Sequence, residues 1–276
     1  MGNAHLLAHA LSIETVQSYF KPRPLDAHKG MFGRILVVGG DLGMPGAVRL
    51  AAEGALRVGA GLATVVTRPA HVAAVVAGRP ELLCYGMDAP FEGLAVLLTN
   101  ATVGVLGSGL GQSLWSHYLF EQVLTSNVPM VVDADALNWL ALEPRHCSSW
   151  VLTPHPGEAA RLLECSIKDI QQDRIQAASA LQQRYGGIVV LKGSGTLLCS
   201  DESRLMRCDA GNPAMASAGM GDLLSGMIAG FMGQGLTPWE AAQAGVLLHA
   251  LAGDRSVAKR GPRGLLASDL LSELAL

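Results

Sequence analysis

A glycine-rich segment that ends in an aspartate is the part of the sequence best suited to chemistry. Residues 211–222 read GNPAMASAGMGD and continue directly into a helix-like stretch at 223–231. Small residues at a helix start leave backbone N–H groups free to face one anion, and the positive helix end adds to the attraction. Asp222 could take a proton from a hydroxyl that attacks a phosphoryl group. On spacing alone, Asp222 could equally cap the helix, a role worth about 1 kcal/mol.

Polar or glycine-rich clusters also follow several apolar runs that resemble buried strands. In open α/β sheets, ligands bind beyond the carboxyl ends of the strands. One such cluster would mean little, but five predict an extended ligand cleft along one edge of a sheet. The five clusters are residues 39–41, 107–111, 133–135, 155–158 and 192–196.

The elements that must position these clusters alternate between strand-like and helix-like patterns. Residues 35–38 form a wholly apolar run, which is typical of a strand buried on both faces. Residues 45–58 then place a proline in the first turn and apolar residues at helical spacing. The alternation continues to residue 191 and predicts an α/β fold with a mainly parallel sheet and helices on both faces.

The last third of the chain departs from this alternation. Residues 196–208 predict a hairpin whose turn is the polar stretch 201–203. Residues 220–252 predict two long helices, and residues 268–275 predict another short one.

Composition excludes several classes of protein. Of 276 residues 33 are glycine, only 16% are charged, and the formal net charge is −3. Disorder would require low hydrophobicity and a high net charge, and nucleic-acid binding would usually show a basic excess. The five cysteines are odd in number and form no C-x-x-C pair, which argues against a disulfide frame or a structural zinc site.

The same sequence predicts a cytoplasmic protein without a membrane span. Its longest uncharged run, residues 93–120, contains polar residues and repeated glycines and so does not predict an apolar helix. The start of the chain lacks the pattern of a secretory signal. We expect residues 1–27 to form an N-terminal arm and residues 28–276 to form one domain.

Residues 211–222 and the L-L-S-G-M-I-A that follows resemble the ribokinase-like superfamily, a group of three-layer α/β sandwiches. The closer resemblance is to the ADP/ATP-dependent NAD(P)H-hydrate dehydratases, and it covers residues 14–276. Three features depart from the family pattern. Ala214 replaces a common glycine, and the turn 39–41 reads G-G-D where many relatives have a serine after the first glycine. The 27 residues before His28 also leave no room for the epimerase domain that many relatives carry. Supporting blocks occur in family order: H-K-G-x-F-G (28–33), G-M-P-G-A (43–47), G-S-G-L-G (107–111), V-D-A-D-A-L (132–137), T-P-H-P-G-E (153–158) and L-K-G-S-G-T (191–196).

The resemblance implies a stand-alone repair enzyme for the S epimer of hydrated NADH or NADPH. The nucleotide, ADP or ATP, would phosphorylate the ring 6-hydroxyl, and phosphate would then leave to restore the dihydronicotinamide. Asp222 would be the base, and the turn formed by Gly219, Met220 and Gly221 would hold the charge that develops on the phosphoryl group.

The resemblance also implies binding residues, each with a simpler structural alternative. Lys192, Gly193, Ser194, Gly195, Thr196 and Gly221 would contact the nucleotide, although residues 192–196 could be a tight turn only. Ala47, Gly109, Gly111, His155 and Asp222 would contact the hydrate, and Glu158 would order water around Mg²⁺. His155 could instead cap a helix, Glu158 could interact with a helix dipole, and Asp133 and Asp135 could serve either the metal or a cap.

Further expectations concern partners and competing functions. The resemblance implies a homotetramer and a functional link to a separate NAD(P)H-hydrate epimerase. One alternative is a small-molecule kinase of the same superfamily, acting on a hydroxyethylthiazole-type alcohol. Another is a nucleotide-binding module without activity. The sequence does not distinguish ADP from ATP, or NADH-hydrate from NADPH-hydrate.

Overall fold

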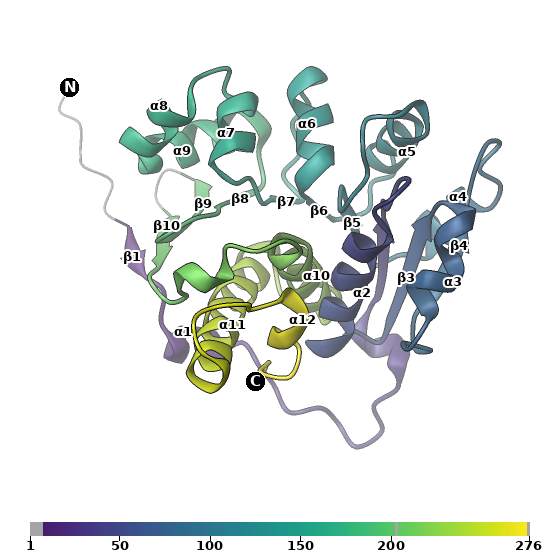
Figure 1. The fold of residues 1–276 in the computed structure, drawn as a ribbon, viewed down its shortest axis with the longest axis horizontal. Helices are drawn as coiled ribbons and strands as arrows, with labels where there is room; N and C mark the ends of the chain where they lie inside the picture. The colour runs from purple at the N-terminus through teal and green to yellow at the C-terminus, as the bar shows by residue number, and fades with distance from the viewer. Residues whose placement is uncertain (1–7, 202–203, 275–276) are drawn as a thin grey trace.

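A ten-stranded sheet lies at the centre of the computed structural model, which describes residues 8–201 and 204–274 (Figure 1). The strand order is β1-β10-β9-β8-β7-β6-β5-β2-β3-β4. Of these strands, only β9 runs against the others, since it pairs antiparallel with both β8 and β10. The strands are β1 (His9–Ala10), β2 (Arg34–Val38), β3 (Leu62–Thr67), β4 (Leu83–Gly86), β5 (Val103–Leu106), β6 (Met130–Val132), β7 (Trp150–Leu152), β8 (Ile188–Leu191), β9 (Thr196–Asp201) and β10 (Arg204–Cys208).

Helices cover both faces of this sheet. In β2, Ile35 and Val37 pack into the core on the side of α2, α10 and α11, whereas Leu36 and Val38 face α4, α5, α6, α7 and α9. Among the described residues, no helix is both long and apolar enough to cross a membrane. The helices are α1 (Ile13–Gln17), α2 (Pro45–Arg57), α3 (Val72–Val76), α4 (Leu94–Asn100), α5 (Leu114–Leu124), α6 (Ala134–Leu142), α7 (Pro156–Leu162), α8 (Ile167–Gln172), α9 (Arg174–Tyr185), α10 (Met220–Gly233), α11 (Pro238–Arg260) and α12 (Ala267–Leu270), with short 3-10 turns at Lys29–Phe32, Pro69–His71 and Pro213–Met215.

The predicted α/β class and its layers are confirmed. The strands β9 and β10 form the expected antiparallel pair, while residues 202–203 of the predicted turn lie outside the described residues. The two long C-terminal helices are α10 and α11. The predicted tail helix is shorter than expected, because α12 ends at Leu270 and residues 271–273 form a turn.

The described part of the predicted N-terminal arm packs against the rest of the chain. Strand β1 pairs in parallel with β10, which extends the sheet at this edge. The side chain of Val16 in α1 is fully buried in the core beside α11. The first described segment therefore contributes to the sheet and to the core.

Glycines bring α2 and α10 into backbone contact. A Cβ atom at Gly226 would lie only 1.8 Å from the carbonyl oxygen of Ala51, and one at Gly54 would lie 2.7 Å from that of Leu223. Only residues without a Cβ permit this approach. The contact matters because the start of each helix carries predicted site residues, Ala47 in α2 and Asp222 in α10.

Candidate active site

The predicted anion turn lies at the start of α10. Gly219 precedes the helix with a φ of 86°, a left-handed conformation that favours glycine. Met220, Gly221 and Asp222 form the first helical turn, where the backbone N–H groups have no partner within the helix. The N–H groups of this turn therefore lie at the positive end of the helix, as an anion site requires.

Asp222 occupies a partly buried position near three other predicted clusters, residues 107–111, 133–135 and 192–196. Burial, together with the charges of Asp133 and Asp135, raises the pKa of its carboxyl group to about 6. The Ser108 hydroxyl and the Lys192 ammonium oppose this shift. A carboxyl group whose pKa lies near the working pH can act as a general base.

Lys192 is held at the anion turn by a buried aspartate. Its Nζ lies 2.7 Å from Oδ1 of Asp133, and Oδ2 of Asp133 accepts a hydrogen bond of 2.7 Å from Ser225. Although burial opposes ionisation, the charge and hydrogen bond of Lys192 hold the pKa of Asp133 below its usual range. A Cβ at Gly221 would lie 3.2 Å from Nζ, so the ammonium group faces the turn.

These contacts decide one of the open alternatives for Asp133. The residue stands at the N-cap position of α6, but its side chain makes no capping hydrogen bond. Its two carboxylate oxygens instead accept hydrogen bonds, Oδ1 from Lys192 and Oδ2 from Ser225. Sequence reasoning left this pairing unassigned, although both Asp133 and Lys192 follow strands at the same edge of the sheet.

The structure confirms the capping alternative for His155. Its Nδ1 accepts hydrogen bonds from the N–H groups of Gly157 and Glu158, at 2.9 and 3.2 Å. Because Nδ1 accepts, the ring proton lies on Nε2, which is 3.3 Å from Oε1 of Glu158. The side chain of His155 remains 54% exposed. Contact with the hydrate stays a prediction and is compatible with this exposure.

Glu158 is a buried carboxyl group in the same capping box. Its Oε2 accepts a hydrogen bond of 2.7 Å from the N–H of His155 and lies 3.8 Å from Nζ of Lys192. Burial, opposed by Lys192 and reinforced by the charge of Asp133, raises the pKa of Glu158 to about 7. The charges of three carboxyl groups, those of Asp133, Glu158 and Asp222, therefore act on one lysine.

The turn formed by residues 192–196 is braced by an arginine that sequence reasoning missed. Gly193 and Gly195 have φ values of 133° and 63°, and the Thr196 hydroxyl donates to the Gly193 carbonyl at 3.0 Å. Ser194 is exposed at the tip. Nη2 of Arg174 donates to the carbonyls of Leu191, Lys192 and Gly195 at 3.1–3.4 Å. This arginine precedes the turn by 18 residues and carried no motif signal.

The predicted hydrate-binding residues Ala47, Gly109 and Gly111 lie together. A Cβ at Gly109, which has a φ of 56°, would approach the Cβ of Ala47 to 3.1 Å. The N–H of Gly111 donates to Oδ2 of Asp135 at 2.8 Å. Ser108 belongs to the same loop and lies near Asp222, so the two halves of the predicted cleft approach each other at that aspartate.

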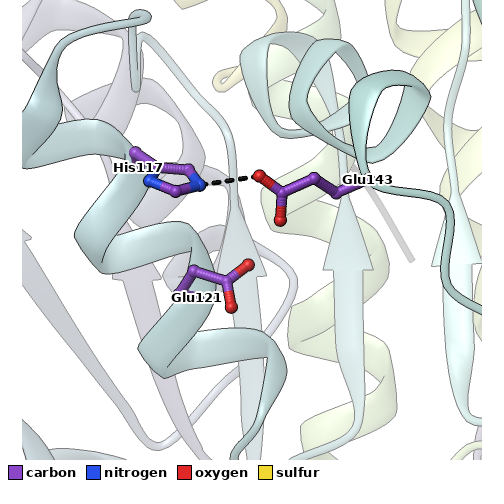
Figure 2. A group of neighbouring side chains, drawn as sticks. All are labelled: His117, Glu121 and Glu143. Carbon is purple, nitrogen blue, oxygen red and sulfur yellow. Dashed lines mark hydrogen bonds and ion pairs between the residues drawn. The ribbon is translucent and has the colours of Figure 1, made fainter.

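A second polar cluster lies between α5 and the end of α6. It consists of His117, Glu121 and Glu143, and His117 Nε2 is 2.8 Å from Glu143 Oε1 (Figure 2). The guanidinium group of Arg145 contacts both glutamates. Because this arginine already supplies positive charge, we assign no metal to the cluster.

A helix that opens with a glycine turn, a carboxyl group in its first turn and a lysine from a nearby strand end together define a ribokinase-like protein. A solved ribokinase-like protein from Enterococcus faecalis has the same fold, with a TM-score of 0.89, 28% identity and coverage of 99% of this chain and 96% of that one. The family model described as NAD(P)H-hydrate dehydratase matches residues 35–276. This chain belongs to the NAD(P)H-hydrate dehydratase family.

Individual relatives agree with this assignment. A bifunctional NAD(P)H-hydrate repair enzyme from Coxiella burnetii is 54% identical over 91% of this chain and 51% of its own length. An ADP-dependent (S)-NAD(P)H-hydrate dehydratase from Neisseria meningitidis is 38% identical over 91% of this chain and 86% of its own. The structure of an ADP/ATP-dependent dehydratase from Bacillus subtilis, co-crystallised with ATP and Mg²⁺, superposes with a TM-score of 0.85 at 28% identity, covering 97% and 96% of the two chains. The chain spans about half the length of the bifunctional relatives.

Proposed function

We propose that this protein uses ADP or ATP to dehydrate the S epimer of hydrated NADH and NADPH. The observation that carries the proposal is the position of Asp222, a carboxyl group with a pKa of about 6 beside an anion turn and a lysine. The names of the Neisseria and Bacillus relatives supply the substrate class.

In the proposed reaction, the oxygen of the hydrate's 6-hydroxyl attacks the terminal phosphoryl group of the nucleotide. Asp222 takes the proton of that hydroxyl during the attack. The bond between that phosphorus and the bridging oxygen breaks and releases AMP from ADP, or ADP from ATP. Phosphate then leaves carbon six, pushed by the lone pair of the ring nitrogen. Loss of a proton from the neighbouring carbon restores the double bond. Phosphorylation helps because phosphate is a far better leaving group than hydroxide.

The chain's own residues would hold the transferring group and the two substrates. The N–H groups of the Gly219–Gly221 turn and the Lys192 ammonium would stabilise the charge on the phosphoryl group. The nucleotide phosphates would be contacted by the backbone N–H groups of the turn at Gly193, Ser194, Gly195 and Thr196. Ala47, Gly109, Gly111 and His155 would line the hydrate side of Asp222.

We further propose that Mg²⁺ assists, with Glu158 holding one of its water ligands. The fit rests on charge, because Asp133, Glu158 and Asp222 offer three carboxyl groups against the one ammonium of Lys192. The Glu158 oxygens are engaged with His155, which favours a contact through water. When bound, Mg²⁺ would offset the negative charge of the nucleotide phosphates.

The pH dependence of turnover tests the role of Asp222. The base must be ionised, so we expect kcat/KM to rise through a midpoint near pH 6, the pKa given by burial and by Asp133. Initial rates measured from pH 5 to 8 at constant ionic strength would check this. A profile that stays flat across this range would contradict an unprotonated Asp222 as the base.

Product analysis distinguishes dehydration from simple phosphorylation. We expect hydrated NADH and ADP to give AMP and inorganic phosphate in equal amounts, with no phosphorylated nicotinamide accumulating. Chromatography of reaction mixtures prepared in parallel with ADP and ATP would also establish the preferred nucleotide. A stable phosphorylated product formed in proportion to the nucleotide used would favour the kinase alternative.

We also propose a cytoplasmic homotetramer that works together with an NAD(P)H-hydrate epimerase. The bifunctional names of the Coxiella and Escherichia coli relatives support the link to a second repair activity. The low charge content of 16% is compatible with buried surfaces between subunits. Light scattering on the purified protein would measure the number of subunits.

A further inference from the structure

One face of α11 packs against the segment 211–220, which leads into the anion turn, at Gly211, Asn212, Met215 and Met220. Ala250 and Asp254 are four residues apart, as are His249 and Gly253, so these four residues lie in two adjacent columns on the helix. All four touch residues 211–220. None of them belongs to the residues predicted to contact the nucleotide or the hydrate.

The carboxylate of Asp254 binds the beginning of this segment. Its Oδ2 accepts from the N–H of Gly211 at 2.9 Å, and its Oδ1 accepts from Nδ2 of Asn212 at 2.8 Å. Oδ1 of Asn212 in turn accepts from the N–H of Ala214 at 3.1 Å, which starts the short 3-10 turn. Asp254 therefore holds both the backbone and the side chain that shape the start of the segment.

The middle and the end of the segment are held from the same side. A Cβ at Gly253 would lie 2.3 Å from Sδ of Met215, so the absence of a side chain at Gly253 makes room for this methionine. The buried ring of His249 lies beside the backbone of Met220, in the anion turn itself. The segment is thus fixed at its start, its middle and its end before the chain enters α10.

We propose that Asp254 is a positioning residue for the anion turn, acting through Asn212 and the segment 211–220. The inference rests on the proposed function, because it assumes that the Gly219–Gly221 turn stabilises the transferring phosphoryl group. Catalytic groups must be held to within a fraction of an ångström, and a shift of about 1 Å can cost roughly 100-fold in rate. Asp254 touches neither substrate in this account.

The hydrogen-bond pattern allows the residue types at positions 254 and 212, aspartate and asparagine, to be exchanged. In Asp254→Asn, an amide group faces the Asn212 amide, and one of the two bonds to position 254 is lost. In Asn212→Asp, two carboxylates face each other. The double variant Asp254→Asn/Asn212→Asp restores all three bonds, because the new amide accepts from Gly211 and donates to the new carboxylate, which still accepts from Ala214.

The test compares both single variants, the double variant and wild type in the dehydration assay. We expect each single variant to lose about 10- to 100-fold in kcat, with the KM for ADP unchanged within about threefold, since every predicted nucleotide contact except Gly221 lies in the untouched 192–196 turn. The double variant should recover most of kcat. Asp26→Asn, the same change at an exposed surface position, should match wild type.

Hydrogen–deuterium exchange of peptides that cover residues 211–222 gives a readout that does not depend on activity. Exchange should be faster in the single variants and return toward the wild-type rate in the double variant. The proposal would be overturned if the single variants showed unchanged exchange and a kcat within about threefold of wild type. It would also be overturned if the double variant had a kcat no higher than either single variant. Should Asp254→Asn fail to fold, Asn212→Asp and the double variant decide the question. An inactive wild type would contradict the proposed function, whereas the exchange rates would still test the role of Asp254.

Discussion

Replacing Asp222 with asparagine should lower kcat by at least ~100-fold, the scale associated with removal of a positioned general base. The amide has nearly the same size as the carboxylate but cannot accept the proton of the attacking hydroxyl. Nucleotide affinity should be retained, because the predicted nucleotide contacts come from residues 192–196 and Gly221. Steady-state rates and calorimetric titration with ADP would measure the two quantities separately.

A stability measurement separates this effect from misfolding. The folded-state pKa of Asp222, about 6, lies above its ordinary value of 3.8. The protonated carboxyl therefore favours the fold at low pH, and this contribution is lost as the pH rises through about 6. At pH 7 the uncharged asparagine should leave Tm at or above that of wild type. A loss in kcat smaller than about threefold would remove Asp222 from the mechanism.

Replacing Asp133 with asparagine should reduce the free energy of unfolding by about 3 kcal/mol, because a largely buried lysine would lose its hydrogen-bonded charged partner. The side chain of Asp133 is 1% exposed and that of Lys192 is 18% exposed. Activity should fall as well, since Lys192 would no longer be held at the anion turn. Urea denaturation monitored by circular dichroism would give the change in stability.

The matched control is Glu164→Gln, which removes a carboxylate from an exposed ion pair with Arg184. Glu164 is 71% exposed, so this change should alter stability by no more than about 0.5 kcal/mol. If Asp133→Asn were as mild as this control, the Asp133–Lys192 pair would not be the element that fixes the lysine.

The parts of the fold that could be predicted are those whose hydrophobic pattern is set by burial on both faces. The wholly apolar run at residues 35–38 forms β2, an interior strand of the sheet that pairs with β3 and β5. The edge strand β4 could not be predicted. Its residues Leu83 and Tyr85 are partly exposed, and the strand contains no continuous apolar run. Strand β1 has only two residues, and its pairing with β10 depends on residues distant in sequence.

For the site, the sequence predicted which clusters would come together but not how their charges are paired. Strand ends at one edge of a parallel sheet must converge, and Asp222 does lie near Ser108, Asp133 and Lys192. The pairing of Lys192 with Asp133 and the bracing of the 192–196 turn by Arg174 are long-range contacts without a local pattern. The capping role of His155 could not be predicted for a different reason. The T-P-H-P-G-E motif is the same whether the histidine caps the helix or only binds a ligand.

The excess of glycine in the sequence acquires a physical explanation at this site. Gly193, Gly195 and Gly219 adopt left-handed backbone conformations where turns must present bare N–H groups. Gly54 and Gly226 instead allow α2 and α10 to touch. The low charge content is consistent with our proposal that backbone amides, a helix start and the largely buried Lys192 hold the phosphates.

Nucleotide-dependent dehydration with Asp222 as the base is tested most directly by mixing the purified protein with hydrated NADH and ADP. The quantity measured is the absorbance of the dihydronicotinamide that forms. We expect the absorbance to return in wild type only when the nucleotide is present, and not to return in Asp222→Asn although ADP still binds. Tight ADP binding without recovery of absorbance in either form would identify a nucleotide-binding module without this activity. Consumption of the nucleotide without recovery of absorbance would contradict dehydration and point to a kinase.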